Sequence, residues 1–253
     1  MKILILGSGS GIADPSRNAS SYLLKTDTVN LLIDAGDGTA RQLARFQIDP
    51  LQIDGVIITH THSDHAAGLF MLMQYMHVRK RVAHLPVYVP QGLLPGFASV
   101  FPYFQIYKGH YGFEFDLYPV KNGLFYSSGQ IDIIGIANSH LEDNVTLARK
   151  EGIDADSYSL DISIHKKSRI LYTSDIQNLK HLEALSHLFR LMICECTHVD
   201  LETASDYAMS HRIPNLILTH IPPHLDVTDK PFFLSEADGI SIEFAEDGKW
   251  IEI

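Results

Sequence analysis

Short apolar runs rich in β-branched residues alternate along the chain with segments whose apolar positions recur at helical spacing. Runs such as 2–7 and 215–219 are bounded by turn-prone residues, which is the pattern of buried strands. Interleaved strands and helices joined by polar turns indicate a layered α/β fold. Strands are predicted at 2–7, 30–34, 55–59, 86–89, 113–120, 131–137, 158–165, 169–174, 190–196, 215–219 and 240–253, and helices at 38–47, 66–80, 178–188 and 200–211. The segment 240–253 is expected to be a hairpin turned by Glu246-Asp247-Gly248.

Length and composition favour one globular unit. The chain has 253 residues, of which 45% are hydrophobic and 20% charged, and these are ordinary proportions for a folded protein. With no linker, repeat or low-complexity tract, residues 1–253 are predicted to form a single domain. No apolar run is long enough to cross a bilayer, and 2–7 is interpreted as the first strand, not a signal peptide. Only Cys194 and Cys196 are present, so we expect reduced, buried thiols in a cytoplasmic protein.

The densest chemistry lies in Thr59-His60-Thr61-His62-Ser63-Asp64-His65, directly after the apolar run 55–58. His60 and His62 point to the same side of extended chain, whereas Asp64 and His65 begin the predicted helix and point elsewhere. Ligands aimed in two directions from one turn suit two adjacent metal ions better than one. Imidazole and carboxylate suit Zn²⁺, with Fe or Mn as alternatives. A histidine-rich surface loop is the simpler alternative, since the chain has 14 His.

The signature H-x-H-x-D-H at 60–65 resembles that of the metallo-β-lactamase fold superfamily, in its ribonuclease Z and phosphodiesterase branch. The other landmarks of that family recur in order along nearly the whole chain, each after an apolar run. They are Leu31-Leu32-Ile33-Asp34-Ala35-Gly36, Asn138-Ser139-His140, Leu171-Tyr172-Thr173-Ser174-Asp175 and Leu216-Ile217-Leu218-Thr219-His220. The resemblance implies a four-layer αβ/βα sandwich of two mixed β-sheets, with metals at one edge.

The resemblance also implies a site with two metal ions and a hydrolytic reaction. The first metal would take His60, His62 and His140, the second would take Asp64, His65 and His220, and Asp175 would bridge them. Two close dications lower the pKa of a shared water, so that hydroxide is available near neutral pH. Asp64 could also orient that nucleophile. We therefore predict a metal-dependent hydrolase with two Zn²⁺ per chain.

A further motif lies between Asp175 and His220. Glu195-Cys196-Thr197-His198-Val199-Asp200 resembles, in compressed form, the Glu and His motifs of ribonuclease Z enzymes and related phosphodiesterases. There a histidine oriented by an acid protonates the leaving group, a role that imidazole suits near neutral pH. His198 could serve in that way, oriented by Glu195 or Asp200. The alternative is a histidine that merely flanks a helix, with Asp200 as its N-cap.

Two other motifs were weighed. Gly7-Ser8-Gly9-Ser10-Gly11 follows a strand, but the turn-like residues after it lack the helix start that dinucleotide binding requires. A tight glycine loop that passes close to the site is the preferred interpretation. Among the remaining histidines, His224 is expected to line the mouth of the site, because it follows His220 closely.

The substrate is the least determined feature. A net charge of −10 argues against a polyanionic nucleic-acid partner, and no Gly/Pro/Lys-rich arm of the kind that grips tRNA is recognisable. Aromatics crowd residues 97–118, where Phe101, Tyr103 and Phe104 are predicted to bind substrate, although core or dimer packing is the usual fate of such residues. We therefore expect a small, largely apolar electrophile of isothiocyanate, ester or lactone type, acted on by a homodimer. A phosphodiesterase or ribonuclease Z-like endonuclease is the alternative, and a non-catalytic metal-binding sensor is the alternative of another class.

Overall fold

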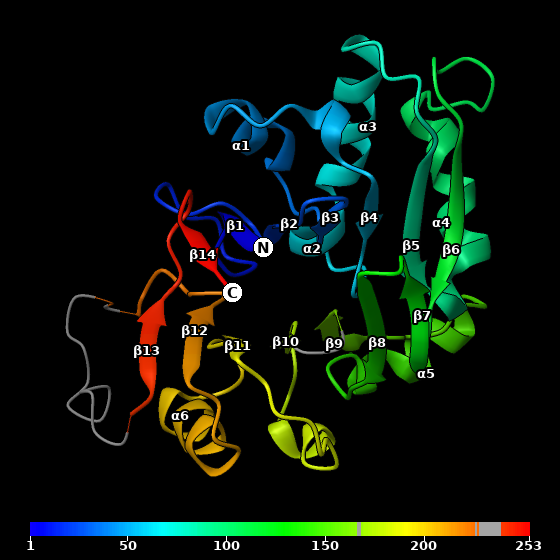
Figure 1. Cartoon of the computed structure of the whole chain (residues 1–253). Coiled ribbons are helices and arrows are strands. Elements are labelled where there is room, and N and C mark those ends of the chain that lie inside the picture. The colour runs from blue at the N-terminus through cyan, green and yellow to red at the C-terminus, as the bar shows by residue number, and fades with distance from the viewer. Residues whose placement is uncertain (166–167, 226, 228–238) are drawn as a thin grey trace.

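The computed structural model describes residues 1–165, 168–225, 227 and 239–253, and within them two seven-stranded sheets face each other (Figure 1). The first sheet has the order β14-β1-β2-β3-β4-β5-β6 and the second β13-β12-β11-β10-β9-β8-β7. The strands of the first are β1 (Lys2–Gly7), β2 (Ser21–Lys25), β3 (Asn30–Ile33), β4 (Gly55–Ile57), β5 (Leu85–Pro90), β6 (Phe115–Val120) and β14 (Trp250–Glu252). Those of the second are β7 (Gly123–Ser127), β8 (Ile131–Ala137), β9 (Tyr158–Ile164), β10 (Ser168–Tyr172), β11 (Leu191–Glu195), β12 (Asn215–Thr219) and β13 (Ser241–Phe244).

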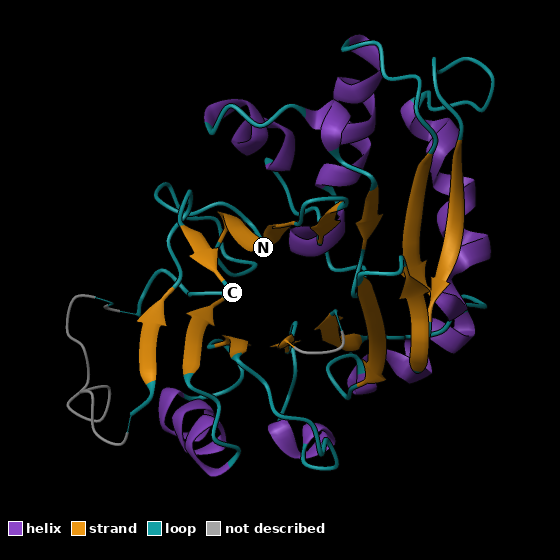
Figure 2. Ribbon diagram, in the orientation of Figure 1, coloured by secondary structure: helices purple, strands orange, loops and turns teal. Residues whose placement is uncertain are grey.

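Helices cover the outer face of each sheet (Figure 2). The α-helices are α1 (Thr39–Arg45), α2 (Ser63–Ala66), α3 (Gly68–Val78), α4 (Leu94–Val100), α5 (Val145–Lys150) and α6 (Leu201–Ser210). Short 3₁₀ turns are η1 (Pro50–Gln52), η2 (Gln91–Leu93), η3 (Phe101–Phe104), η4 (Glu142–Asn144) and η5 (Leu179–Leu182). Among the helices of the described residues, none has the length and apolar character needed to span a membrane.

Three apolar clusters hold the layers together. One fills the space between the sheets, where alternate residues of β1 and β9 meet. A second packs α3 on the first sheet, and a third packs α6 and η5 on the second. β1 is buried on both faces and reads as a continuous apolar run, whereas β9 alternates apolar residues with buried polar ones. The resulting order of helix, sheet, sheet and helix is the predicted four-layer αβ/βα sandwich.

The parallel strands decide where chemistry can gather. β3, β4, β5 and β6 run parallel in the first sheet, and β10, β11, β12 and β13 run parallel in the second. Their carboxyl ends open into loops, and ligands of open α/β sheets bind outside such ends. The carboxyl ends of β4, β10 and β12 therefore present their following residues at a common edge.

The predicted hairpin at 240–253 is wrong. β13 pairs with β12 in the second sheet, whereas β14 pairs with β1 in the first. The turn at Asp247 thus carries the chain from one sheet to the other. Gly248 has φ +94 and lies so close to Phe46 that a Cβ would come within 2.5 Å of its ring, which accounts for glycine here. Alternation alone could not distinguish a hairpin from two edge strands of different sheets.

Two predicted helices differ from the structure. The helix expected at 66–80 begins earlier, as α2, and is interrupted at Ala67 before α3. The helix expected at 178–188 is only η5, and residues 183–188 after it form turns and irregular chain. The strands β2 and β7 and the helices α4 and α5 were not predicted, since they are short and their patterns are weak.

Candidate metal centre

Strand ends place all the predicted metal-binding side chains at one edge. His60 follows β4, Asp64 and His65 lie in α2, and Asp175 follows β10. His140 follows β8 and His220 follows β12. These residues form two groups whose ligand atoms lie within 4.8 Å of one another. Donor set one is His60, His62, His140 and Asp175; donor set two is Asp64, His65, His220 and Asp175.

Donor set one is built mostly of imidazoles. His140 Nε2 lies 3.1 Å from His62 Nδ1 and 3.6 Å from Asp175 Oδ2. His60 Nε2 lies 3.8 Å from the same carboxylate oxygen. Three nitrogens and one oxygen thus converge on one point, which is the donor number of a tetrahedral site.

Donor set two contains a second carboxylate. His65 Nε2 lies 3.2 Å from Asp175 Oδ1, and His220 Nε2 lies 3.3 Å from Asp175 Oδ2. His220 Nε2 is also 3.1 Å from Asp64 Oδ2. Asp175 therefore contacts both sets, as a carboxylate shared by two cations would.

Three of the donor atoms lack any other partner, as expected of atoms that face a divalent cation. His60 Nε2, His65 Nε2 and Asp175 Oδ1 are buried and make no hydrogen bond within the described residues. Leaving such atoms unsatisfied costs about 1–3 kcal/mol each, and buried polar groups are otherwise almost always paired. Orphaned donors that converge on common points indicate a site for metal.

The protonation states of His60, His140 and Asp175 agree with coordination, whereas in His65 burial opposes the charged form but Asp175 and Asp34 outweigh it and raise the pKa well above its ordinary value. Burial, reinforced by neighbouring imidazoles, holds the pKa of His60 well below its ordinary value, and burial lowers the pKa of His140 to about 4. Burial opposes ionisation of Asp175, but His65 and His220 outweigh it and hold the pKa of that carboxyl well below its usual range. Neutral imidazole and ionised carboxylate are the forms that bind metal.

Asp34 lies behind donor set two and orients His65. Its Oδ2 accepts hydrogen bonds from His65 Nδ1 at 2.9 Å and from the Tyr172 hydroxyl at 2.8 Å. Its Oδ1 accepts one from the Thr59 amide at 2.8 Å. The bond to Nδ1 leaves His65 Nε2 free to face the donor set, the usual arrangement behind a metal-binding histidine. The sequence pattern assigned no role to Tyr172, although it lies in the run 171–175 that ends at Asp175.

The glycine loop passes beside donor set two, as the sequence suggested. A Cβ on Gly11 would lie 3.2 Å from Asp64 Oδ2, and no helix follows within 12–20. The dinucleotide interpretation therefore has no structural basis. Gly36 is more tightly constrained, because a Cβ there would come within 2.1 Å of the Asp64 carbonyl oxygen.

His198 and Glu195 form a pair at the rim of the cluster. His198 Nδ1 lies 3.0 Å from Glu195 Oε1, and the His198 ring is centred 4.9 Å from His140 and 6.1 Å from His220. The hydrogen bond with Glu195 raises the pKa of His198. Asp200 does not orient His198; it caps α6 by accepting a 2.8 Å hydrogen bond from the Thr203 amide.

Glu195 also belongs to a third group of potential metal ligands, with His198 and His220, but hydrogen bonds occupy its carboxylate. Its carboxylate, almost fully buried, also accepts hydrogen bonds from the amides of Thr197 at 2.6 Å and His198 at 2.9 Å. Thr197, which sequence reasoning also missed, holds His220 through a 3.0 Å contact between its hydroxyl and His220 Nδ1. Cys194 and Cys196 are buried free thiols, as expected.

The predicted substrate lining by Phe101, Tyr103 and Phe104 is corrected by the structure. Phe101 is buried against Phe115. Phe115 pairs with Leu85, the first residue of β5, at the end of that strand opposite the metal edge. The six residues of β5 span roughly 20 Å. Phe104 stacks on Phe70 of α3, and Tyr103 is 86% exposed. Phe101 thus packs with Phe70 of α3 and Phe97 of α4 in the core of the first sheet.

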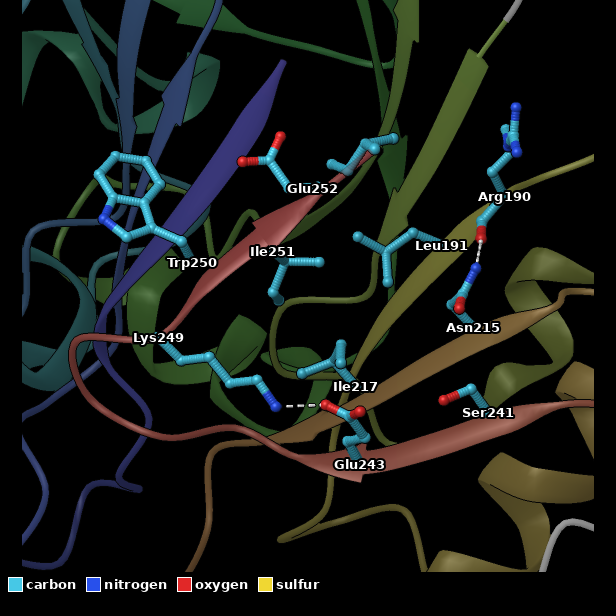
Figure 3. Close-up of a pocket in the computed structure, with 11 residues that line it drawn as sticks. Arg190, Leu191, Asn215, Ile217, Ser241, Glu243, Lys249, Trp250, Ile251 and Glu252 are labelled. Atoms are coloured by element: carbon cyan, nitrogen blue, oxygen red, sulfur yellow. Dashed lines mark hydrogen bonds and ion pairs between the residues drawn. The ribbon is translucent and has the colours of Figure 1, made fainter.

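His224 is exposed, and its place at the mouth of the site stays a prediction. A cavity of about 280 Å³ opens between the sheets beside β13 and β14 (Figure 3). It lies at the amino ends of β11 and β12, opposite the metal edge. Aliphatic side chains and the Lys249–Glu243 ion pair line it, so it offers no set of metal donors.

Asp64→Asn is expected to lower turnover far more than stability. Asp64 lies in the first turn of α2 and is not its cap, since the N-cap residue is His62. The amide keeps the shape of the side chain but loses the charge that faces His220 and His65. Thermal melting, metal content and turnover of the variant test this, with near-native turnover and both metals retained as the contrary result.

The fold and the two groups of potential metal ligands define a protein of the metallo-β-lactamase fold. More narrowly, residues 1–212 match the family described as Anti-Pycsar protein Apyc1, and the chain belongs to it.

Curated relatives carry the name ribonuclease Z. The protein of Thermoplasma acidophilum is 25% identical over 94% of this chain and 91% of its own length. That of Pyrococcus horikoshii is 35% identical over 46% of this chain, a match that spans only 36% of the relative. The chain thus spans less than half the length of several of these relatives.

Solved structures share the fold along the whole chain. The metallo-β-lactamase fold protein YhfI from Bacillus subtilis superposes with a TM-score of 0.80 at 21% identity, covering 100% of this chain and 98% of that one. Human tRNase Z, short form, gives 0.76 at 20%, covering 100% and 99%. A diphosphatase from the PhnP family gives 0.73 at 20%, covering 100% and 97%.

Proposed function

We propose that residues 1–253 act as one di-metal phosphodiesterase domain with zinc as the resident cation, Fe or Mn being the alternatives. Two divalent cations held by the donor sets would supply hydroxide near neutral pH and stabilise charge on the attacked phosphoryl group. Asp64 orients the nucleophile, and Asp175 contributes its carboxylate to both donor sets. The proposal follows the relatives, whose names describe a ribonuclease, a tRNase and a diphosphatase.

The observation that carries the proposal is the His198–Glu195 pair. An alkoxide is a poor leaving group, so cleavage of an alkyl phosphodiester gains from a proton donor beside the metals. The His198 imidazole lies at that position, and Glu195 accepts a hydrogen bond from its Nδ1 and thereby directs Nε2 outward. His198 would protonate the leaving oxygen from Nε2. Attack of hydroxide on an isothiocyanate expels no alkoxide, so that reaction does not need this proton donor.

A small apolar electrophile is the weaker candidate. Its support was the aromatic segment 97–118, and Phe101 and Phe104 pack away from the donor sets. A compact phosphodiester is favoured over tRNA because the net charge of −10 opposes a long polyanion. A non-catalytic sensor would be expected to lack a ligand, whereas both donor sets are complete. The homodimer stays a prediction, which light scattering tests.

One substrate panel tests the proposal. Metal-loaded protein is offered bis(p-nitrophenyl) phosphate, cyclic mononucleotides, precursor tRNA, a p-nitrophenyl carboxylic ester and benzyl isothiocyanate. Phosphodiester turnover that a chelator abolishes and added Zn²⁺ or Mn²⁺ restores is the expected result. Cleavage of tRNA with steep salt dependence would favour the endonuclease alternative. Turnover of the carboxylic ester or isothiocyanate alone would refute the phosphodiesterase.

A further inference from the structure

Asp247 is far in sequence from the glycine loop, yet its carboxylate accepts hydrogen bonds from both ends of that loop. Oδ1 accepts hydrogen bonds from the Ser8 amide at 2.9 Å and the Ser8 hydroxyl at 2.8 Å. Oδ2 accepts them from the Asn18 amide at 2.7 Å and from Gln42 Nε2 at 2.7 Å. Asp247 lies outside the 1–212 segment that matches the family. A carboxylate that receives this many donors is a strong fixed anchor.

These bonds fasten both ends of the segment 8–18, which we call the glycine loop. The Gly9 amide closes the loop by donating to the Asn18 carbonyl at 2.9 Å. Arg17 ties the same end to the neighbouring segment, since its Nη1 donates to the Ser8 hydroxyl at 2.8 Å and to the Ala245 carbonyl at 2.7 Å. The hydrogen bonds to Asp247 therefore fix the two ends of the glycine loop, and, in the described part of the chain, its tip makes no direct bond to this carboxylate.

The glycine loop contacts donor set two by two routes. Its base pairs with the residue after His220, because the Ile221 amide donates to the Ser8 carbonyl at 2.8 Å and the Ser10 amide donates to the Ile221 carbonyl at 3.3 Å. Its tip at Gly11 abuts the Asp64 carboxylate, which a Cβ there would approach to 3.2 Å. Asp64 and His220 belong to set two and not to set one.

We propose that Asp247 is a positioning residue for the second metal: it fixes the glycine loop against Asp64 and His220 and so raises the affinity of donor set two for its cation. Asp247 acts without contact to the metal, through Ser8 and Asn18. The backbone of His220 is also strained, with φ +53, and a residue in that region keeps its conformation only when its surroundings hold it. The inference rests on the di-metal site of the proposed function.

The test is a metal titration of the full chain. Apoprotein is titrated with Zn²⁺ against a chromophoric chelator, for the wild type and for Asp247→Ala and Asp247→Asn. The wild type should bind two cations per chain. Both variants should bind the first with unchanged affinity and the second about 10–100-fold more weakly, the range seen when support behind a ligand is lost. Turnover should return at high Zn²⁺ concentration.

Matched variants separate positioning from general damage. Asp54→Ala removes a carboxylate that accepts a 2.8 Å hydrogen bond from the Asn30 amide at the other end of β4, and it should leave both affinities unchanged. Ser8→Ala removes one donor to Asp247 and should weaken the second site by less than Asp247→Ala does. If Asp247→Ala fails to fold, Asp247→Asn and Ser8→Ala decide.

The outcomes distinguish the two proposals. Equal weakening of both cation sites, or no weakening of the second, would overturn the positioning role. A second site weakened selectively in a protein that hydrolyses no phosphodiester would support the positioning role and refute the proposed function.

Discussion

Replacing Asp175 by asparagine is expected to lower turnover by roughly 10³-fold or more and to reduce the bound metal below two per chain. The carboxylate faces both donor sets and is 2% exposed, so no water or neighbouring group can take its place. Loss of the shared negative charge weakens both cations at once. Each cation contributes several kcal/mol of charge stabilisation in the transition state, and each 1.36 kcal/mol is tenfold in rate.

Metal analysis and steady-state kinetics on the same preparation of Asp175→Asn measure both effects. Asp132→Asn is the matched control, because that carboxylate also lies in the second sheet but bonds only to the Ser127 hydroxyl among the described contacts. Two tightly bound cations with near-native turnover in Asp175→Asn would contradict the shared role of Asp175.

The second large effect is expected for His198→Ala, and its size should depend on the leaving group. For an alkyl or nucleoside leaving group, the loss of a positioned acid should cost about 10²–10⁴-fold. For p-nitrophenolate, which leaves without protonation, the loss should be small. Rates of both substrate types with the variant, and with His84→Ala as a surface control, test this. Equal losses on both substrates would show that His198 is not the acid.

The same pair predicts a direction on the pH axis. Glu195 raises the pKa of His198 through their hydrogen bond, so the imidazolium persists to higher pH. As the acid, His198 works when protonated, and turnover should fall as the pH rises through its folded pKa. Glu195→Gln should therefore move the basic limb of the turnover profile to lower pH. An unmoved basic limb would separate Glu195 from the chemistry.

Local sequence determined much of this protein. The strands at 2–7, 131–137 and 215–219 have the predicted bounds. β1 and β12 are buried along most of their length and read as apolar runs, whereas β8 buries alternate residues. The partition of the ligands into two sets with Asp175 common to both was also predicted, from the resemblance to the metallo-β-lactamase fold superfamily. The donor sets in the structure have the same membership, and their roles as metal ligands stay a proposal.

Tertiary structure alone decided the features that join distant segments. Nothing near Phe101 indicates that it would pack on Phe115 rather than face the metals, because an aromatic side chain satisfies either surface. Glu195 and Asp200 were both possible partners of His198 in the sequence, and the structure uses Asp200 as the N-cap of α6 instead. Asp247 reaches Ser8 across 239 positions, and the apparent hairpin around it divides between two sheets. Periodicity reports only which face a residue presents, whereas these contacts arise from how the sheets and loops pack against one another.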